Sequence, residues 1–145
     1  MQGPFGRFVL DQERAAVFIA GGIGITPLKG MAEYASDVAL PIEVRLLYSN
    51  SRKEEIPFRN ELDELERGNP RFRVLHTLTG NDVAPGWDGL VGRIGERHLL
   101  EAARGLKPPV YYVSGKPEMV ATAVNVLADL LVPEADIRVE LFRGY

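Results

Sequence analysis

Short apolar runs alternate with longer amphipathic stretches along this chain of 145 residues. The two most apolar runs, 15–20 and 109–114, have the composition of strands covered on both faces of a sheet. Further strands are predicted at 42–48, 71–78 and 136–142. The intervening stretches predict helices at 27–38, 58–67, 95–104 and 117–131. This alternation predicts an α/β fold of three layers, built on a doubly wound sheet of five parallel strands in the order 3-2-1-4-5.

The segment 80–92 differs from these periodic stretches because it contains four glycines, one proline and Trp87. We expect a loop there, with Trp87 as a packing residue rather than a ligand contact. Residues 1–10 are predicted to be a linker, and residues 11–145 form a single domain because no repeat or low-complexity tract divides them.

The amino-acid composition and net charge argue against several classes of function. Hydrophobic residues make up 46% of the chain, which is enough for a core, and the net charge of −3 gives no broad field for nucleic acid. No apolar run approaches the roughly 20 residues that span a bilayer. Cysteine is absent and the only histidines are His76 and His98, so we expect no metal site. The expected setting is the cytoplasm.

A glycine-rich turn follows the first strand directly, in the segment Gly21-Gly22-Ile23-Gly24-Ile25-Thr26-Pro27. Glycine allows the backbone to come close to a ligand, and Thr26 is predicted to cap the following helix with Pro27 at its first position. The unpaired N–H groups of such a helix start suit a pyrophosphate. Pro27 stands where the usual dinucleotide fingerprint has its third glycine, which indicates a variant of that turn.

The fourth predicted strand ends in a similar turn, Ser114-Gly115-Lys116-Pro117-Glu118-Met119. In a sheet of order 3-2-1-4-5 the first and fourth strands are neighbours, and ligands bind outside their carboxyl ends. The two turns are therefore expected to flank one crevice.

These motifs resemble the nucleotide-binding half of the ferredoxin–NADP reductase family of flavoproteins. Gly3-Pro4-Phe5-Gly6 is similar to the family's interdomain segment, and 21–27 to its pyrophosphate motif. Residues 114–119 resemble the Cys-Gly-Pro-x-x-Met motif, with Ser114 in place of cysteine and Lys116 in place of proline. The end of the chain, 140–145, resembles the aromatic tail that covers the flavin. The family's flavin-binding barrel has no counterpart here, so 1–10 would be the end of a missing flavin domain and 11–145 the NAD(P)-binding domain.

The resemblance implies hydride transfer from NAD(P)H to an FAD bound mainly by a partner domain or subunit. Single electrons would then pass to ferredoxin, an iron–sulfur cluster or haem. It places Thr26, Ser114 and Phe142 nearest the reacting groups. The other implied cofactor contacts come from the two turns and the tail: Gly21, Gly22, Gly24, Ile25, Pro27, Gly115, Lys116, Pro117, Met119 and Tyr145. Phe142 and Tyr145 are alternatives for the aromatic residue that covers the flavin.

The end of the second strand normally meets the adenosine ribose, and the segment 49–53 occupies that place. Its predicted contacts are Ser49, Ser51, Arg52 and Lys53. The positive charges of Arg52 and Lys53 favour the 2′-phosphate of NADPH. The acidic pair that follows them offsets this charge, so NADH remains an alternative cofactor. A catalytically inactive nucleotide-binding or electron-transfer subunit is the alternative function. A receiver-type signalling domain is disfavoured because no aspartates cluster at the strand ends.

Overall fold

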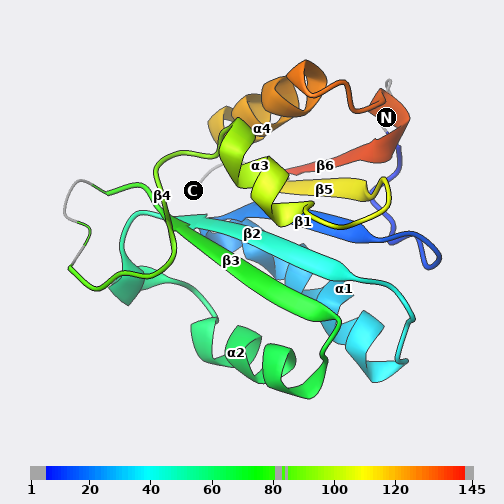
Figure 1. Ribbon diagram of the computed structural model, residues 1–145, viewed down its shortest axis with the longest axis horizontal. Coiled ribbons are helices and arrows are strands. Elements are labelled where there is room, and N and C mark those ends of the chain that lie inside the picture. The colour runs from blue at the N-terminus through cyan, green and yellow to red at the C-terminus, as the bar shows by residue number, and fades with distance from the viewer. Residues whose placement is uncertain (1–5, 81–82, 84, 143–145) are drawn as a thin grey trace.

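A computed structural model describes residues 6–80, 83 and 85–142, and these form a parallel sheet between two layers of helices (Figure 1). The strands are β1 (Ala16–Gly21), β2 (Val44–Asn50), β3 (Phe72–Leu78), β4 (Leu90–Val91), β5 (Val110–Gly115) and β6 (Ile137–Leu141). The helices are α1 (Ile25–Asp37), α2 (Arg59–Gly68), α3 (Glu96–Ala102) and α4 (Pro117–Asp129). Single 3₁₀ turns lie at Gly22–Gly24, Lys53–Glu55 and Glu134–Asp136.

The strands have the order β4-β3-β2-β1-β5-β6. The predicted α/β class and doubly wound order are thus confirmed for the five longer strands. The sixth strand, β4, lies inside the segment predicted to be a loop. It pairs with the end of β3 over just two positions, Thr77↔Leu90 and Leu78↔Val91. A strand of two residues next to a glycine is too short to show an alternating pattern, which explains why the sequence does not reveal it.

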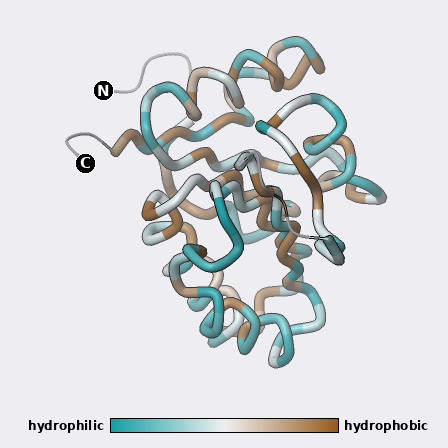
Figure 2. The backbone as a smooth tube through the Cα atoms, turned by 90° about the vertical axis from the view of Figure 1, so that its left-hand side faces the viewer, coloured by the Kyte–Doolittle hydropathy of each residue, from teal (hydrophilic) through white to brown (hydrophobic). Residues whose placement is uncertain are grey.

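The two faces of the sheet bury separate apolar clusters. Along β1, Phe18 packs into the cluster that α1 and α2 cover, whereas Val17 and Ile19 pack into the cluster that α3 and α4 cover. All three side chains are fully buried. Figure 2 shows the apolar stretches mostly in the middle of the molecule, with hydrophilic stretches around them. A strand buried on both faces explains the continuous apolar run of the sequence.

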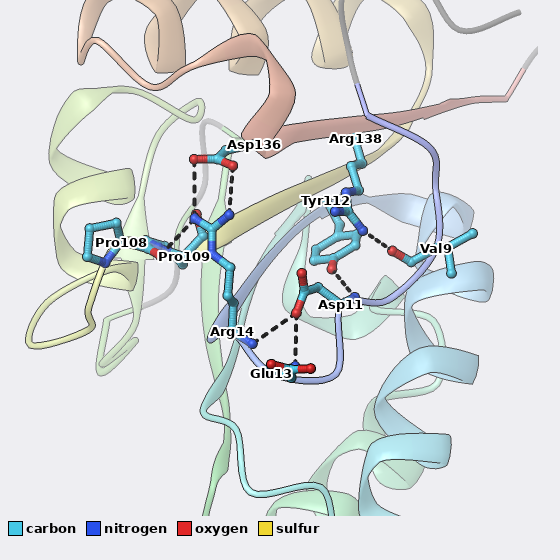
Figure 3. Close-up of polar contacts among 9 residues, drawn as sticks. All are labelled: Val9, Asp11, Glu13, Arg14, Pro108, Pro109, Tyr112, Asp136 and Arg138. Atoms are coloured by element: carbon cyan, nitrogen blue, oxygen red, sulfur yellow. Dashed lines mark hydrogen bonds and ion pairs between the residues drawn. The ribbon is translucent and has the colours of Figure 1, made fainter.

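A polar cluster fastens the N-terminal segment across the amino ends of the strands (Figure 3). The Arg14 guanidinium pairs with Asp136 at 2.7 Å, just before β6. The backbone N–H of Asp11 donates to the Tyr112 hydroxyl at 2.7 Å, and Arg138 donates to the carbonyl of Val9. This cluster lies opposite the carboxyl ends of the strands, and so it leaves that other edge of the sheet open.

Within the described parts of the chain, no helix has both the length and the apolar character needed to cross a bilayer. Those same residues contain no group of histidine and carboxylate side chains suited to hold a metal ion.

Candidate functional site

The two glycine-rich turns pack directly against each other at the carboxyl ends of β1 and β5. A Cβ atom built on Gly24 would lie 2.6 Å from the carbonyl oxygen of Ser114 and 2.7 Å from the Cα of Gly115. Real Cβ atoms do not approach backbone atoms so closely. Glycine at position 24 is therefore required for this contact, and the expected meeting of the two turns is confirmed.

The first turn enters its helix differently from the prediction. Gly22 has φ +53°, a 3₁₀ turn spans Gly22–Gly24, and α1 begins at Ile25 with Gly24 as its N-cap. The prediction that Thr26 caps the helix is wrong, since its hydroxyl donates back to the carbonyl of Ile23 at 3.1 Å. The 3₁₀ turn continues straight into α1, so the backbone is already helical at the cap. Pro27 still lies in the first turn, where a missing N–H costs nothing.

Tyr48 stabilises the first glycine turn through its side-chain hydroxyl. Its fully buried hydroxyl lies 2.9 Å from the carbonyl oxygen of Gly22 and 3.1 Å from that of Pro57. Burial raises the pKa of the Tyr48 phenol, and a side-chain hydrogen bond with Asn50 lowers this pKa by a smaller amount. The phenol thus stays protonated and available as a donor to these carbonyl groups.

A groove runs over the carboxyl ends of β1, β2, β3 and β5 as two adjoining pockets. The first has a volume of about 390 Å³ and is lined by Gly21, Gly22, Ile23, Ser49, Asn50, Ser51, Glu55, Pro57, Thr79, Lys116 and Met119. The second, of about 350 Å³, is lined by Thr79, Arg93, Ile94, Lys116, Glu118, Met119 and Thr122. The two pockets share Thr79, Lys116 and Met119, so they adjoin at these three residues.

Six of the residues predicted from the sequence line this groove: Gly21, Gly22, Ser49, Ser51, Lys116 and Met119. Met119 lies where the turns meet, since a Cβ on Gly21 would be 3.4 Å from its methyl group. Lys116 lines both pockets and supplies a positive charge beside the first turn. These side chains come from three different strand ends, which the sheet brings together.

Other predicted residues lie beneath or beside the groove. The buried residues Gly24, Ile25, Ser114 and Gly115 line neither pocket. The Ser114 side chain is fully buried, and its hydroxyl makes no hydrogen bond with any described residue. Thr26, Pro27 and Pro117 lie in the first turns of α1 and α4 and line neither pocket.

The C-terminal tail reaches the second turn. The backbone N–H of Phe142, the last described residue, donates to the carbonyl of Gly115 at 2.9 Å. Phe142 thereby lies at the edge of the site, next to the position that the resemblance assigns to nicotinamide. Tyr145 falls outside the described residues.

The two cations predicted for a 2′-phosphate, Arg52 and Lys53, do not line the groove. Arg52 has a side chain that is 66% exposed, with its Nε atom 3.7 Å from Glu54, and neither Arg52 nor Lys53 lines either pocket. Arg93 lines the second pocket instead, in the connection from β4 to α3.

Nine lining residues are absent from the contacts predicted from the sequence, among them Asn50, Thr79 and Arg93. Asn50 and Thr79 end or follow a strand, which is a signal that could have identified them. Arg93 follows the short strand β4, which the sequence does not reveal.

Curated proteins and solved structures with the same fold include several reductases. The chain is 31% identical to ferredoxin–NADP reductase B of Sorangium cellulosum, over 97% of its own length and 60% of that protein. It superposes on the cytochrome b5 reductase domain of Ulva prolifera nitrate reductase with a TM-score of 0.79 at 24% identity, covering 88% of this chain and 50% of that one.

A third likeness is to the flavohem-like FAD/NAD-binding domain of nitric oxide dioxygenase from Vibrio cholerae. Its TM-score is 0.78 at 22% identity, over 94% of this chain and 54% of that domain. The chain thus spans between half and two thirds of these relatives. Residues 18–125 match the model of the oxidoreductase NAD-binding domain, and the chain belongs to that family.

Proposed function

We propose that this chain is the nucleotide-binding half of a flavin-dependent NAD(P)H reductase. The observation that carries the proposal is the contact of the two glycine turns, because it brings Gly24 against Ser114 and Gly115 beside pockets of about 390 and 350 Å³ at the carboxyl ends of the strands. A helix N-terminus next to a close-packed glycine turn is an anion site, and Lys116 adds a positive charge beside it.

The residues of this chain would hold the cofactor rather than carry out proton transfer. Main-chain N–H groups of the first turn and Lys116 would bind the pyrophosphate, while Met119 and the second turn would shape the nicotinamide side. NAD(P)H and FAD, when bound, supply the redox chemistry. Thr26, Ser114 and Phe142 are the residues we place nearest the reacting groups, with Phe142 held there by its bond to Gly115.

The flavin would be bound mainly by a part that this chain does not supply. The chain covers 54% of the Vibrio cholerae FAD/NAD-binding domain and 60% of the Sorangium cellulosum reductase, which leaves room for a flavin domain in each. The names of the relatives include ferredoxin and cytochrome b5. We accordingly propose ferredoxin, an iron–sulfur cluster or haem as the electron acceptor and the cytoplasm as the setting.

We assign the 2′-phosphate of NADPH to Arg93 rather than to Arg52. Arg93 lines the second pocket together with Thr79, whereas Arg52 lies outside both pockets and next to Glu54. The carboxylate of Glu118 also lines the second pocket and offsets part of this charge. We therefore expect NADPH to be preferred over NADH by a modest factor.

A titration of the isolated chain with NADP⁺ and with NAD⁺, followed by backbone amide NMR, tests these assignments. Shifts at Gly22 and Gly24 with both ligands are expected. The Arg93→Gln variant should weaken NADP⁺ binding about tenfold and leave NAD⁺ binding unchanged. Arg52→Gln is the matched control and should change neither affinity. Silence at both glycines up to millimolar ligand would refute the nucleotide site, and equal loss for the two variants would refute Arg93.

The alternative, an inactive nucleotide-binding subunit, keeps the same groove. Its supporting observation is the buried Ser114, where the family commonly has cysteine. Anaerobic mixing with NADPH and a flavin-loaded partner domain separates the two functions. Bleaching of the flavin absorbance is expected for the reductase, whereas binding of NADPH without bleaching would establish the inactive subunit.

A further inference from the structure

The imidazole of His98, in the first turn of α3, contacts two backbone groups at the two ends of one connecting segment. The backbone N–H of Gly95, the N-cap residue of α3, donates to Nδ1 at 3.2 Å. Nε2 of the same ring lies 3.0 Å from the carbonyl oxygen of Val91, which ends β4. One side chain thus holds both ends of the connection from β4 to α3, residues 91–95.

These two contacts fix the charge and the tautomer of the His98 ring. A backbone N–H can only donate, so Nδ1 must accept with its lone pair, and a backbone carbonyl can only accept, so Nε2 must carry the proton. In an imidazolium both nitrogens carry protons. Protonation of His98 would therefore set two N–H groups against each other and break the bond to Gly95, while the bond to Val91 would remain.

Two residues of the connection, Arg93 and Ile94, line the second pocket of about 350 Å³. Ile94 is 5% exposed and packs in the cluster that α3 and α4 cover, whereas Arg93 is exposed. At the β4 end of the connection, the N–H of Gly92 donates to the carbonyl of Leu78 at 2.8 Å. At the α3 end, the N–H of the N-cap residue is held by the His98 ring. The position of Arg93 therefore depends on His98 at the α3 end.

The pocket beside the His98 ring contains few charged groups. It has a volume of about 340 Å³ and is lined by Gly89, Leu90, Val91, Arg97, His98 and Glu101. The β4 side of this pocket contributes no charge, and α3 contributes one cation and one anion besides the ring itself. Glu101 pairs with Arg104 at 2.9 Å. Carboxylates and guanidinium groups ordinarily keep their charges between pH 5 and 8, whereas histidine ordinarily titrates in this range.

The elements behind α3 and the second histidine do not change this picture. α4 packs against α3 through the apolar cluster that contains Leu99, and Arg45 of β2 donates to backbone carbonyls at the other end of α3. Burial lowers the pKa of His76, the other histidine of the chain, to about 4, so its ring stays neutral between pH 5 and 8. A response of the connection to pH in this range would therefore come from His98.

We propose that His98 is a positioning residue that acts as a pH-sensitive latch: its neutral ring holds the α3 end of the segment 91–95, and protonation releases it. Release lets Arg93 leave the second pocket, so NADP⁺ binding should weaken on acidification. This consequence rests on the proposed function, which assigns the 2′-phosphate to Arg93. The latch itself involves the chain alone and needs no nucleotide.

NMR of the wild-type chain without nucleotide tests the latch directly. The measurement follows the ring nitrogens of His98 and the backbone amides of Arg93 and Gly95 from pH 8 to pH 5. At pH 8 we expect a proton on Nε2 and none on Nδ1. On acidification both amides should shift along the titration curve of the His98 ring. A proton on Nδ1 at pH 8, or an Arg93 amide that does not follow His98, overturns the inference.

Two substitutions at position 98 separate the bond to Gly95 from its sensitivity to pH. His98→Gln keeps an acceptor for the N-cap N–H, as glutamine does at the same helix position in capping boxes, and it cannot become charged. His98→Ala removes the acceptor. Leu100→Ala, on the same helix and 54% exposed, is the matched control. In His98→Gln the amides of Arg93 and Gly95 should not move between pH 8 and pH 5.

Calorimetric titration of the four proteins with NADP⁺ and NAD⁺ measures the effect on binding. At pH 8 the wild type, His98→Gln and Leu100→Ala should bind NADP⁺ alike, and His98→Ala about 3- to 10-fold more weakly. At pH 5 the wild type should fall to the level of His98→Ala, with His98→Gln remaining tighter by the same factor. A phosphate monoester itself takes up a proton near pH 6, so the proteins are compared with one another at each pH. NAD⁺ lacks the 2′-phosphate and should bind all four alike.

The outcomes distinguish the latch from the proposed function. The inference is overturned if His98→Gln loses NADP⁺ affinity on acidification as the wild type does, or if NAD⁺ binding falls as much as NADP⁺ binding. Should His98→Ala fail to fold, the comparison of the wild type with His98→Gln still decides. A wild-type chain that binds neither nucleotide refutes the proposed function, and the NMR titration then decides on the latch by itself.

Discussion

The contact between the two glycine turns predicts that replacing glycine by alanine lowers the stability of the protein at position 24 but raises it at position 30. In Gly24→Ala the new methyl group would meet the carbonyl oxygen of Ser114 at 2.6 Å, and the Cα and N atoms of Gly115 at 2.7 and 2.9 Å. These are backbone atoms of a central strand, so they cannot rotate away. Overpacking of this kind costs about 1–3 kcal/mol. The backbone at Gly24 has φ −60° and ψ −9°, which alanine adopts freely, so the entire cost comes from the clash.

Gly30→Ala is the matched control. Gly30 lies in the middle of α1, and a Cβ there would meet nothing within 4 Å. Alanine in an exposed helix interior stabilises by roughly 0.5–1 kcal/mol relative to glycine. Urea denaturation followed by circular dichroism should therefore show Gly24→Ala below the wild type and Gly30→Ala above it. Nucleotide binding should weaken in Gly24→Ala alone. A Gly24→Ala variant as stable as the wild type would refute the close packing of the turns.

Three further predictions follow from single side chains. Tyr48→Phe removes the hydroxyl bonded to Gly22, and we expect a loss of about 1–2 kcal/mol in urea denaturation with a shift of the Gly22 amide resonance. Burial lowers the pKa of His76 from its usual 6.5 to about 4, so the unfolded chain binds more protons between these values. The free energy of unfolding should then fall by roughly 1–2 kcal/mol as the pH drops through that range, and His76→Gln should flatten the profile. Asp136→Asn breaks the partly exposed ion pair with Arg14 and should lower the free energy of unfolding by about 1 kcal/mol at low salt and by less at high salt, in the same assay.

The main elements of the fold could be predicted from the sequence because a strand that is buried on both faces gives a continuous apolar run. The continuous apolar run at β1 and the similar run at β5 are short and end at glycines, which is typical of strands in a parallel sheet with helices on both sides. β4 could not be predicted, because a strand of two residues beside a glycine is too short to show a hydrophobic pattern. The helix start at Ile25 was misplaced for a related reason, because a 3₁₀ turn before α1 has no distinctive sequence pattern.

The backbone of the candidate site could also be predicted from the sequence, but most of its side chains could not. Gly24 packs against the backbone of Ser114 and Gly115, and a close approach of this kind can be inferred from glycine spacing and sheet order alone. The groove side chains depend on how each loop folds back after its strand. Arg52 and Arg93 are both exposed cations in loops, and only the three-dimensional arrangement shows that Arg93 lines the groove.

This division between backbone and side chains also explains why relatives with low identity can share the fold. The anion site that we propose consists of backbone N–H groups around Gly22, Gly24 and Gly115, and any sequence that keeps these glycines can reproduce it. We propose that preference between NADPH and NADH depends on a few side chains at the rim of the pockets, of which Lys116 and Arg93 carry positive charge here. Substitutions at the rim leave the buried glycine contact intact. Cofactor preference should therefore vary among such chains while the pyrophosphate turn stays the same.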